Sequence, residues 1–421
     1  LVIPLMAKIK KIKGFSDLFP PESELYARME DSARRVFSRY GCRELRLPLL
    51  ERTELFARSI GDETDIVQKE MYTFPDRKGR SLTLRPEATA GVVRAYIEAQ
   101  QYARENVGKY YTVGPMFRYE RPQKGRTRQF HQVNVEVLGP ESPMADAELI
   151  MMLVDYLRDL GLKDIQIELN SLGCSKCRPD FHAALSEFLH GLNAQELCQD
   201  CRERMDKNPL RVLDCKVDSC REVMRNAPRI SDFLCAECRE HFRAVKETLE
   251  SAEIEFVLNP LLVRGLDYYQ RTTFEVVSAD IGAQASVAGG GRYDGLVKAL
   301  GGPDISGLGF ACGMERLAML LGGDGDQTLD FYLAVLNEEA MSTALVLGQH
   351  LRGSGYRGEV AFEAASPRSQ LRLANKLGAK TCLLIGLDEM QRGEVMVKDM
   401  ETGVQRAVSQ DDLEQAVGLK R

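Results

Sequence analysis

The first 170 residues alternate between helical and strand-like hydrophobic patterns. Between residues 21 and 40, Leu25, Met29, Ala33 and Val36 recur at spacings of three and four, which predicts a helix with one buried face. The same period predicts further helices at residues 88–105 and 145–160. Shorter apolar runs predict strands at residues 42–50, 82–86, 110–119, 132–138 and 165–169. We therefore expect a sheet flanked by helices, in which a basic loop joins the strands at 110–119 and 132–138 into an antiparallel hairpin.

The pattern changes after residue 170. Residues 171–250 are rich in charges and cysteines and have mainly helical periodicity, which indicates an insertion. Strand patterns return at 255–262 and 272–277, and the segment 307–320 is predicted to be a strand followed by an apolar helix. Beyond the candidate linker Asp324-Gly325-Asp326, strands at 331–335, 358–362 and 381–385 alternate with helices at 338–353 and 367–377. The predicted fold class is α+β, with a helical insertion and a C-terminal α/β domain.

Composition limits the cellular setting. A chain of 421 residues is long enough for two or three domains, and 44% hydrophobic and 28% charged residues are typical of a globular protein. No apolar run is long enough for a membrane span, and no signal peptide is recognisable, so we expect a cytoplasmic protein without a membrane partner. The net charge of −6 means that any site for nucleic acid must be a local cluster of basic residues.

Three arginines stand out because each lies beside glycine or at the end of a predicted element. They are Arg118 in Phe117–Pro122, Arg264 in Leu262–Tyr269 and Arg316 in Gly307–Leu317. The planar guanidinium group offers paired donors to phosphate oxygens and stays charged at any working pH. One such arginine is more often a solvated surface charge, but three suggest a triphosphate site. The chain has no GxxxxGK[ST] loop, which argues against P-loop chemistry.

These segments resemble motifs of the class II aminoacyl-tRNA synthetases, and most closely those of the histidyl-tRNA synthetase family. Phe117–Pro122 with its return strand resembles the second class motif, and Gly307–Leu317 resembles the third. The helix and strand ending at Pro48 resemble the first motif, which in the family forms much of the dimer interface. Leu262–Tyr269 and Ala288–Gly295 resemble two peptides specific to histidyl enzymes. The resemblance runs from about residue 8 to the C-terminus.

The resemblance implies a histidine–tRNA ligase, which activates histidine with ATP and transfers it to its cognate tRNA, and which is a homodimer. Arg118 and Arg264 would be catalytic, holding the α-phosphate from two sides, with Arg264 where other enzymes of the class use a metal. Arg316 would bind the γ-phosphate, and Glu120 and Arg126 would also contact ATP. Mg²⁺ would bridge the remaining phosphate oxygens.

A second set of residues is implied for histidine. The ammonium group would contact Glu87, Thr89 and Gln132, the ring nitrogens would contact Glu136 and Tyr269, and Arg264, Tyr268 and Tyr293 would complete the pocket. A pocket that hydrogen-bonds both ring nitrogens rejects analogues lacking them more strongly than an apolar pocket does. The tyrosines could equally be ordinary core aromatics. Glu136 is harder to explain in that way, because an unpaired buried carboxylate is costly.

The basic loop carries four cations in residues 121–129, which is the local patch that an RNA contact needs. We expect Lys124, Arg126 and Arg128 to contact the acceptor end of the tRNA. The alternative is a solvated hairpin tip.

The insertion contains paired cysteines with the spacing of metal ligands. The pairs are Cys174 and Cys177, Cys198 and Cys201, Cys215 and Cys220, and Cys235 and Cys238. Two such pairs can hold one tetrahedral zinc ion, so the insertion is predicted to bind one or two structural Zn²⁺. The alternative is that these are reduced thiols or remnants of a lost site.

The resemblance also divides the chain. Residues 6–170 and 251–323 would form the catalytic domain, 171–250 the insertion, and 329–421 an anticodon-binding-like domain. One rival interpretation is the non-catalytic regulatory subunit of ATP phosphoribosyltransferase, which resembles the catalytic domain alone. The intact peptide around Arg264 and the C-terminal domain argue against it. A synthetase for proline or threonine is the other rival, and the peptide around Tyr268 and Tyr269 argues against that.

Overall fold

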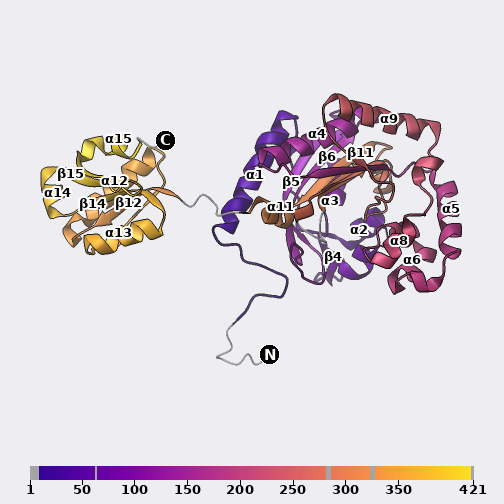
Figure 1. The fold of residues 1–421 in the computed structure, drawn as a ribbon, viewed down its shortest axis with the longest axis horizontal. Coiled ribbons are helices and arrows are strands. Elements are labelled where there is room, and N and C mark those ends of the chain that lie inside the picture. Colours follow the sequence, from indigo (N-terminus) through magenta and orange to yellow (C-terminus); the bar gives the residue numbers. More distant parts are fainter. Residues whose placement is uncertain (1–8, 62–63, 281–285, 323–327, 419–421) are drawn as a thin grey trace. The chain divides into compact units, whose positions relative to one another are not determined.

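The computed structural model describes residues 9–61, 64–280, 286–322 and 328–418, and the chain forms two compact units (Figure 1). The larger unit comprises residues 1–18 and 25–323, and the smaller comprises 19–24 and 324–421. The predicted linker Asp324-Gly325-Asp326 and the first residues of the predicted catalytic domain, 6–8, lie outside the described residues.

The larger unit is built on an eight-stranded sheet. In spatial order its strands are β1 (Arg43–Glu44), β5 (Gly108–Phe117), β6 (Gln129–Gly139), β11 (Ser306–Gly313), β10 (Ser286–Arg292), β9 (Gln270–Val277), β7 (Gln166–Ser171) and β8 (Val257–Leu258). Only the edge pairs β1–β5 and β7–β8 are parallel, and the other neighbours are antiparallel. The predicted α+β fold with an antiparallel sheet is confirmed.

Two long helices cover one face of this sheet, α1 (Glu22–Arg39) and α4 (Pro143–Asp159). Apolar side chains alternate along the central strands, so Val133, Val135 and Val137 of β6 point into the core that α1 and α4 close. The hydroxyl of Ser142 caps α4 by accepting a hydrogen bond from the backbone N–H of Met144, which satisfies one free donor of the first turn. The opposite face of the sheet is left for the candidate site.

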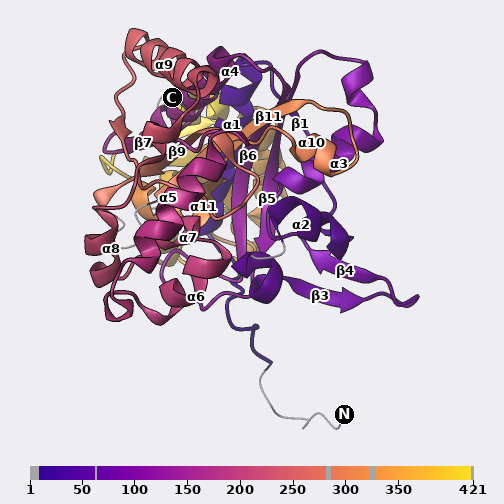
Figure 2. The ribbon, with the colours of Figure 1, turned by 90° about the vertical axis from the view of Figure 1, so that its right-hand side faces the viewer.

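Shorter elements surround the sheet. Helices are α2 (Thr53–Ile60), α3 (Thr89–Glu98), α10 (Leu296–Ala299) and α11 (Met314–Leu321), with a π-helical turn at Ile66–Glu70 and a 3-10 turn at Gln101–Ala103. A separate three-stranded sheet has the order β2 (Leu50–Arg52), β4 (Ser81–Leu84) and β3 (Tyr72–Pro75), and β3 and β4 project from the unit as a ribbon (Figure 2).

The insertion leaves the sheet after β7 and returns at β8, the neighbouring strand, so both of its ends lie at one sheet edge. Its helices are α5 (Arg178–His190), α6 (Gln199–Lys207), α7 (Leu210–Leu213), α8 (Asp218–Met224) and α9 (Ala236–Ser251), with 3-10 turns at Ala194–Glu196 and Ile230–Phe233. The helix α9 packs along α4, while α5, α6 and α8 gather beside the sheet (Figures 1 and 2). The predicted helical insertion is therefore confirmed as a feature of the fold.

The smaller unit is an α/β sandwich, as predicted. Its sheet has the order β13 (Gly358–Val360), β12 (Leu329–Val335), β14 (Ala379–Ile385), β15 (Glu394–Asp399) and β16 (Gln405–Ser409). The strands β13, β12 and β14 are parallel to one another. The strand β15 is antiparallel to β14, and β16 is antiparallel to β15. Its helices are α12 (Met341–Gly353), α13 (Pro367–Lys376), α14 (Leu387–Arg392) and α15 (Leu413–Gly418), with 3-10 turns at Glu338–Ala340 and Gln410–Asp412.

Three predicted elements are wrong in extent. Residues 42–50 are not one strand, because β1 ends at Glu44 and β2 belongs to the other sheet. The strand expected at 255–262 is only Val257–Leu258, since Asn259 begins a turn in which its backbone oxygen accepts from the N–H of Leu262 at 3.0 Å. The helix expected at 88–105 ends at Glu98 and is followed by the 3-10 turn.

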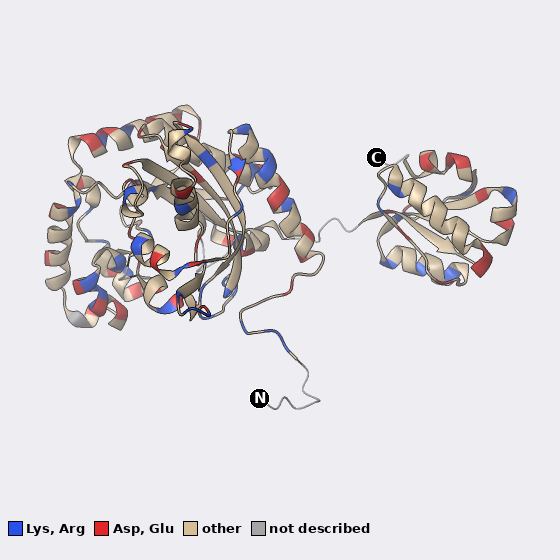
Figure 3. Ribbon diagram, turned by 180° about the vertical axis from the view of Figure 1, so that it is seen from behind, with Lys and Arg blue, Asp and Glu red and all other residues tan. Residues whose placement is uncertain are grey.

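Charged positions are interspersed along the helices of both units rather than segregated by sign (Figure 3). Among the described residues, no helix combines the length and apolar character that crossing a bilayer requires.

A candidate active site over the central strands

A cavity of about 1350 Å³ lies in the larger unit, bordered by the free face of the sheet, the β5–β6 loop and the insertion. Several residues predicted for ATP or histidine line it. They are Arg118, Glu120, Arg126, Gln132, Arg264 and Arg316. The cavity therefore brings together side chains that are almost 200 positions apart in the sequence.

Each of the three arginines is held by a different element. Arg118 follows β5, and its Nε donates to the carbonyl oxygen of Pro86 at 2.9 Å. Arg316 lies in the first turn of α11, and its Nη1 donates to the carbonyl oxygen of Ser286. Arg264 lies in the irregular segment before β9, and its Nη1 donates to Glu275 Oε1 at 3.1 Å. The printed contact of Arg264 uses only part of its guanidinium group, which leaves donors for a ligand.

A glycine on the sheet makes room for Arg264. A Cβ atom at Gly289 would lie 2.3 Å from Arg264 Nη1, closer than nonbonded atoms can approach. The missing side chain at position 289 thus allows the guanidinium group to lie against the strand.

Two arginines of the cavity, Arg126 and Arg316, are close enough to repel each other. Burial lowers the pKa of Arg316, and the positive charge of Arg126 lowers it further. Burial also lowers the pKa of Arg264, but neighbouring groups, Glu275 first among them, raise it overall. Within the part of the chain that the structure describes, Arg264 Nε is buried without a hydrogen-bond partner. An anionic ligand would relieve the repulsion between Arg316 and Arg126 and would supply acceptors to Arg264.

The predicted histidine residues form a buried group next to this cavity. Glu136 lies on β6, and its two carboxylate oxygens accept hydrogen bonds from Thr89 Oγ1 and from the Tyr293 hydroxyl. Burial raises the pKa of Glu136 to about 8, because the two hydroxyl donors only partly replace water. Burial therefore favours the neutral form of this carboxyl group.

Three tyrosines surround this carboxyl group. The ring of Tyr268 lies 4.7 Å from that of Tyr269 and 5.6 Å from that of Tyr293, measured between centroids. The Arg264 guanidinium lies 5.6 Å from the Tyr269 ring centroid. All three tyrosines are buried, so they belong to the core as well as to the candidate pocket. Arg264 joins this group to the cavity.

Two residues predicted for the ammonium group differ in their surroundings. Glu87 already accepts backbone hydrogen bonds from Thr89 at 2.6 Å and Ala90 at 2.9 Å, and so stabilises the start of α3. Its pKa is raised, chiefly by burial. Gln132 lines the cavity, and its buried Oε1 has no hydrogen-bond partner among the described residues.

The basic loop does not hold its cations together. Lys124 is exposed, whereas Arg126 lines the cavity and pairs with Glu120 at 3.0 Å. Arg128 stacks its guanidinium 3.8 Å from the Tyr119 ring centroid. The three predicted tRNA-contacting residues thus lie in three different environments.

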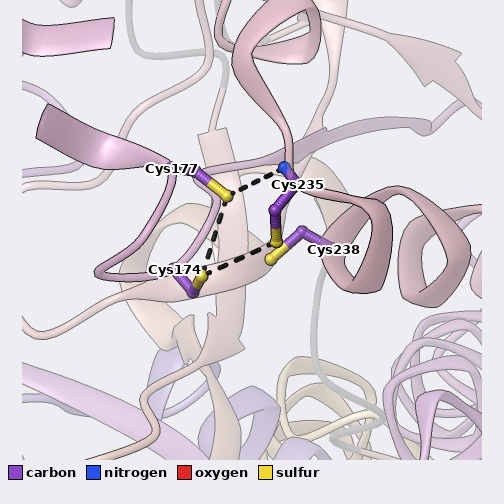
Figure 4. Close-up of side chains that lie close together, drawn as sticks. All are labelled: Cys174, Cys177, Cys235 and Cys238. Atoms are coloured by element: carbon purple, nitrogen blue, oxygen red, sulfur yellow. Dashed lines mark hydrogen bonds between the residues drawn. The ribbon is translucent and has the colours of Figure 1, made fainter. Parts of the chain in front are cut away.

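The eight cysteines of the insertion form two groups of four. Cys174 and Cys177 lie with Cys235 and Cys238, and Cys198 and Cys201 lie with Cys215 and Cys220. In each group all four sulfur atoms lie within 4.8 Å of one another. The sulfur atoms of the first group point toward a common centre (Figure 4).

Sequence reasoning missed several residues that position the site. Glu275 holds Arg264, Arg211 donates to the carbonyl oxygen of Arg264 at 3.2 Å, and Arg178 donates to the carbonyl oxygen of Tyr269. Glu275 carried a usable signal, since it is a charge within the apolar run Thr273–Val277. Arg178 and Arg211 carried no such signal, because they lie in the helical insertion, where charged residues are common.

Comparisons with known proteins agree with this geometry. The histidyl-tRNA synthetase family model matches residues 14–317, and an anticodon binding domain model matches residues 330–418. An antiparallel sheet with this arginine-lined cavity, followed by an anticodon-binding unit, defines a class II aminoacyl-tRNA synthetase.

Individual relatives give the family. The chain is 60% identical over 406 residues to a histidine–tRNA ligase of Nitratidesulfovibrio vulgaris strain Hildenborough, which covers 96% of this chain and 97% of the relative. It is 50% identical over 401 residues to a histidine–tRNA ligase of Geobacter sulfurreducens, and this match covers 94% of this chain and 96% of the relative. The crystal structure of apo S. aureus histidyl-tRNA synthetase matches with a TM-score of 0.80 and 35% identity, covering 97% of this chain and 99% of that one. The chain belongs to the histidyl-tRNA synthetase family.

Proposed function

We propose that this chain is a histidine–tRNA ligase. The histidine carboxylate attacks the α-phosphorus of ATP, which gives histidyl-adenylate and pyrophosphate. The 3′ end of the cognate tRNA then takes the histidyl group, which gives histidyl-tRNA and AMP for protein synthesis. The observation that carries this proposal is the 60% identity to a histidine–tRNA ligase along almost the whole chain, combined with an arginine-lined cavity that suits a triphosphate.

The first step requires alignment of two anions and stabilisation of the charge that develops at phosphorus. Arg118 and Arg264 hold the α-phosphate from two sides, and Arg316 binds the γ-phosphate. Glu120 and Arg126, which pair with each other, lie on the ATP side. Mg²⁺ bound together with ATP would help to neutralise the charge of the phosphates. The buried Nε of Arg264, which has no hydrogen-bond partner among the described residues, and the repulsion between Arg316 and Arg126 support these roles.

Histidine is selected through its ring and its ammonium group. Glu136 and Tyr269 contact the ring nitrogens, and Tyr268, Tyr293 and Arg264 complete the pocket. The hydroxyl groups of Thr89 and Tyr293 only partly replace water at the buried Glu136 carboxyl group, which supports a ligand contact there. The ammonium group contacts Glu87, Thr89 and Gln132. The buried, unpartnered Oε1 of Gln132, judged over the described residues, supports that contact.

The remaining roles concern tRNA, assembly and location. Lys124, Arg126 and Arg128 contact the acceptor end of the tRNA, and the smaller unit docks on the anticodon. Residues 6–170 and 251–323 form the catalytic domain, 171–250 the insertion and 329–421 the anticodon-binding domain. The two family matches, which end at residue 317 and begin at residue 330, support the boundary before the last domain. The protein is a cytoplasmic homodimer whose interface includes the segment ending at Pro48.

The insertion holds one or two structural Zn²⁺ ions through Cys174, Cys177, Cys198, Cys201, Cys215, Cys220, Cys235 and Cys238. Thiolate sulfur is a preferred ligand of zinc, and the two groups of four match the ligand number of a structural site. The metal itself takes no part in the chemistry.

Exchange of labelled pyrophosphate into ATP tests the activity. We expect exchange to depend on histidine and on no other amino acid, and to fall by about 10²- to 10³-fold in Arg264→Ala, because one donor to the developing charge is lost. Arg225→Ala is the matched control, since Arg225 also lines the cavity but is solvent-exposed. Exchange driven by another amino acid, or histidine binding with no exchange, would contradict the proposal.

A further inference from the structure

The two cysteine groups have the geometry of two separate metal sites. In the first site, Cys174 Sγ lies 3.6 Å from Cys177 Sγ and 4.0 Å from Cys235 Sγ (Figure 4). In the second site, Cys198 Sγ lies 3.8 Å from Cys215 Sγ. Disulfides require about 2.05 Å between sulfurs. Tetrahedral Zn²⁺ with bonds of about 2.3 Å places sulfurs roughly 3.8 Å apart, which agrees with these distances.

The two sites also share a backbone arrangement. Cys235 and Cys198 each precede the first turn of a helix, α9 and α6, with nearly equal φ and ψ angles of −64° and 165°, and −65° and 165°. Each donates its backbone N–H to a sulfur of its own group, Cys235 to Cys177 at 3.2 Å and Cys198 to Cys220 at 3.1 Å. Hydrogen bonds to ligating sulfur orient the ligand and favour its thiolate form.

The segment between β8 and β9 contains Arg264, Tyr268 and Tyr269, and it has no regular helix or strand from residue 259 to 269. Its conformation therefore depends on neighbouring parts of the chain. We call residues 262–271 the histidine peptide. Each cysteine group lies next to one end of it.

The first site adjoins the C-terminal end of the histidine peptide. The backbone N–H of Arg271 donates to the carbonyl oxygen of Gly173, the residue before Cys174, at 2.8 Å. Arg178, next to Cys177, donates from Nη2 to the carbonyl oxygen of Tyr269. Two neighbours of metal ligands therefore hold the backbone of the ring-binding tyrosine segment.

The second site adjoins the N-terminal half. Residues 202–214 connect its two cysteine pairs, and two side chains of this connection reach the histidine peptide. Arg211 Nη1 donates to the carbonyl oxygen of Arg264 at 3.2 Å, and Asn208 Nδ2 donates to Asp267 Oδ1 at 3.1 Å. The backbone of Arg264 is thus fixed from the insertion.

We propose that the insertion is a clamp with two tetrathiolate Zn²⁺ sites, Cys174–Cys177–Cys235–Cys238 and Cys198–Cys201–Cys215–Cys220, which together hold the two ends of the histidine peptide. Arg178 and Arg211 are positioning residues that connect the sites to the peptide. The ions act only through this connection, because neither cysteine group contains a residue assigned to substrate. The role of the clamp in histidine binding rests on the proposed function.

Metal content tests the sites. The full-length chain, purified without chelator, is expected to contain two zinc ions by plasma mass spectrometry. Cys235→Ser and Cys198→Ser are each expected to lose one, because each removes a ligand from a different group. Cys382→Ser is the control, since Cys382 is a buried cysteine of the smaller unit, and it should keep both. Less than one zinc per chain in an active wild-type enzyme, or loss of both ions from each single variant, would overturn the two-site assignment.

Histidine affinity tests the clamp without requiring that a metal site be broken. Arg178→Met and Arg211→Met should keep both ions but weaken histidine binding about 10- to 100-fold by calorimetry, because misplaced binding groups are costly. Arg243→Met on α9, an exposed position, is the matched control with unchanged affinity. Unchanged affinity in both positioning variants would overturn the clamp. Two bound ions in a chain with no histidine-dependent exchange would instead overturn the proposed function and leave the metal sites standing.

Discussion

The buried carboxyl group of Glu136 should make the stability of this protein depend on pH in an unusual direction. Its pKa is raised from an ordinary value of 4.5 to about 8, chiefly by burial. The folded state holds this proton more tightly than the unfolded state, so the protonated carboxyl group stabilises the folded state. This stabilisation is complete below about pH 4.5, decreases as the pH rises and is lost above about pH 8. One pKa unit corresponds to about 1.36 kcal/mol, so the difference between the folded and the unfolded pKa corresponds to about 5 kcal/mol of folding free energy.

Glu136→Gln isolates this effect, because the amide keeps the shape of the side chain and cannot ionise. We expect the melting temperature of the wild type to fall relative to that of the variant between pH 5 and pH 9, by on the order of 5 to 10 °C. Differential scanning fluorimetry at constant ionic strength, without ATP or histidine, measures the difference. Glu141→Gln is the control, since Glu141 is an exposed carboxylate and should follow the wild type.

Parallel melting curves for the wild type and Glu136→Gln across this range would refute the reasoning, since they would mean that Glu136 does not change its charge there. The same carboxyl group should also control proton exchange on histidine binding. At pH 9 the empty site is ionised and free imidazole is neutral, so pairing a protonated ring with Glu136 requires uptake of about one proton. Calorimetry in two buffers of different ionisation enthalpy would measure this uptake, and Glu136→Gln should abolish it.

Three further substitutions test other parts of the molecule. Arg126→Ala should slow transfer to tRNA by at least about tenfold more than it slows pyrophosphate exchange, because a phosphate contact to RNA is lost. Equal losses in the two assays would contradict a contact between Arg126 and tRNA. Gly289→Ala should lower kcat for pyrophosphate exchange by about 10²-fold, because the added methyl group displaces the Arg264 guanidinium. An unchanged kcat would show that the close approach of Arg264 to this strand is unimportant. The Arg292 guanidinium of β10 forms an ion pair with Asp146 of α4, and both side chains are buried. Asp146→Asn should cost about 3–5 kcal/mol of stability, measured by denaturant unfolding, because it leaves Arg292 buried beside a neutral amide. A cost below about 1 kcal/mol would show that other acceptors suffice.

Local patterns were enough to predict the long elements of the fold. The helix α4 combines an apolar stripe with a serine cap and a proline in its first turn, and all three features act within the helix itself. The β5–β6 hairpin has the same property, since its strands are adjacent in sequence and joined by one polar loop. The α/β order of the smaller unit was readable because apolar strands alternate there with amphipathic helices.

Features that depend on distant partners were not readable. Cys174-x2-Cys177 was recognisable as half of a metal site, but its partner pair is set by the return of α9 to the edge of the sheet. The strand expected at 42–50 failed because its two ends pair with different sheets, a choice that no local pattern records. The contact between Arg178 and Tyr269 likewise depends on how the insertion packs.

The register of the sheet explains why two of its strands are so rich in small residues. Glu136 on β6 lies opposite Gly309 on β11, and Glu275 on β9 lies opposite Gly289 on β10. Directly paired residues point to the same face, so the two carboxylates stand on either side of a floor formed by two strands with little side-chain bulk. A Cβ atom at Gly309 would lie 1.9 Å from Glu136 Oε2, just as one at Gly289 would collide with Arg264. The glycines therefore do not loosen the sheet. They leave room for the Glu136 carboxylate and the Arg264 guanidinium over neighbouring strands, the first proposed to contact histidine and the second ATP.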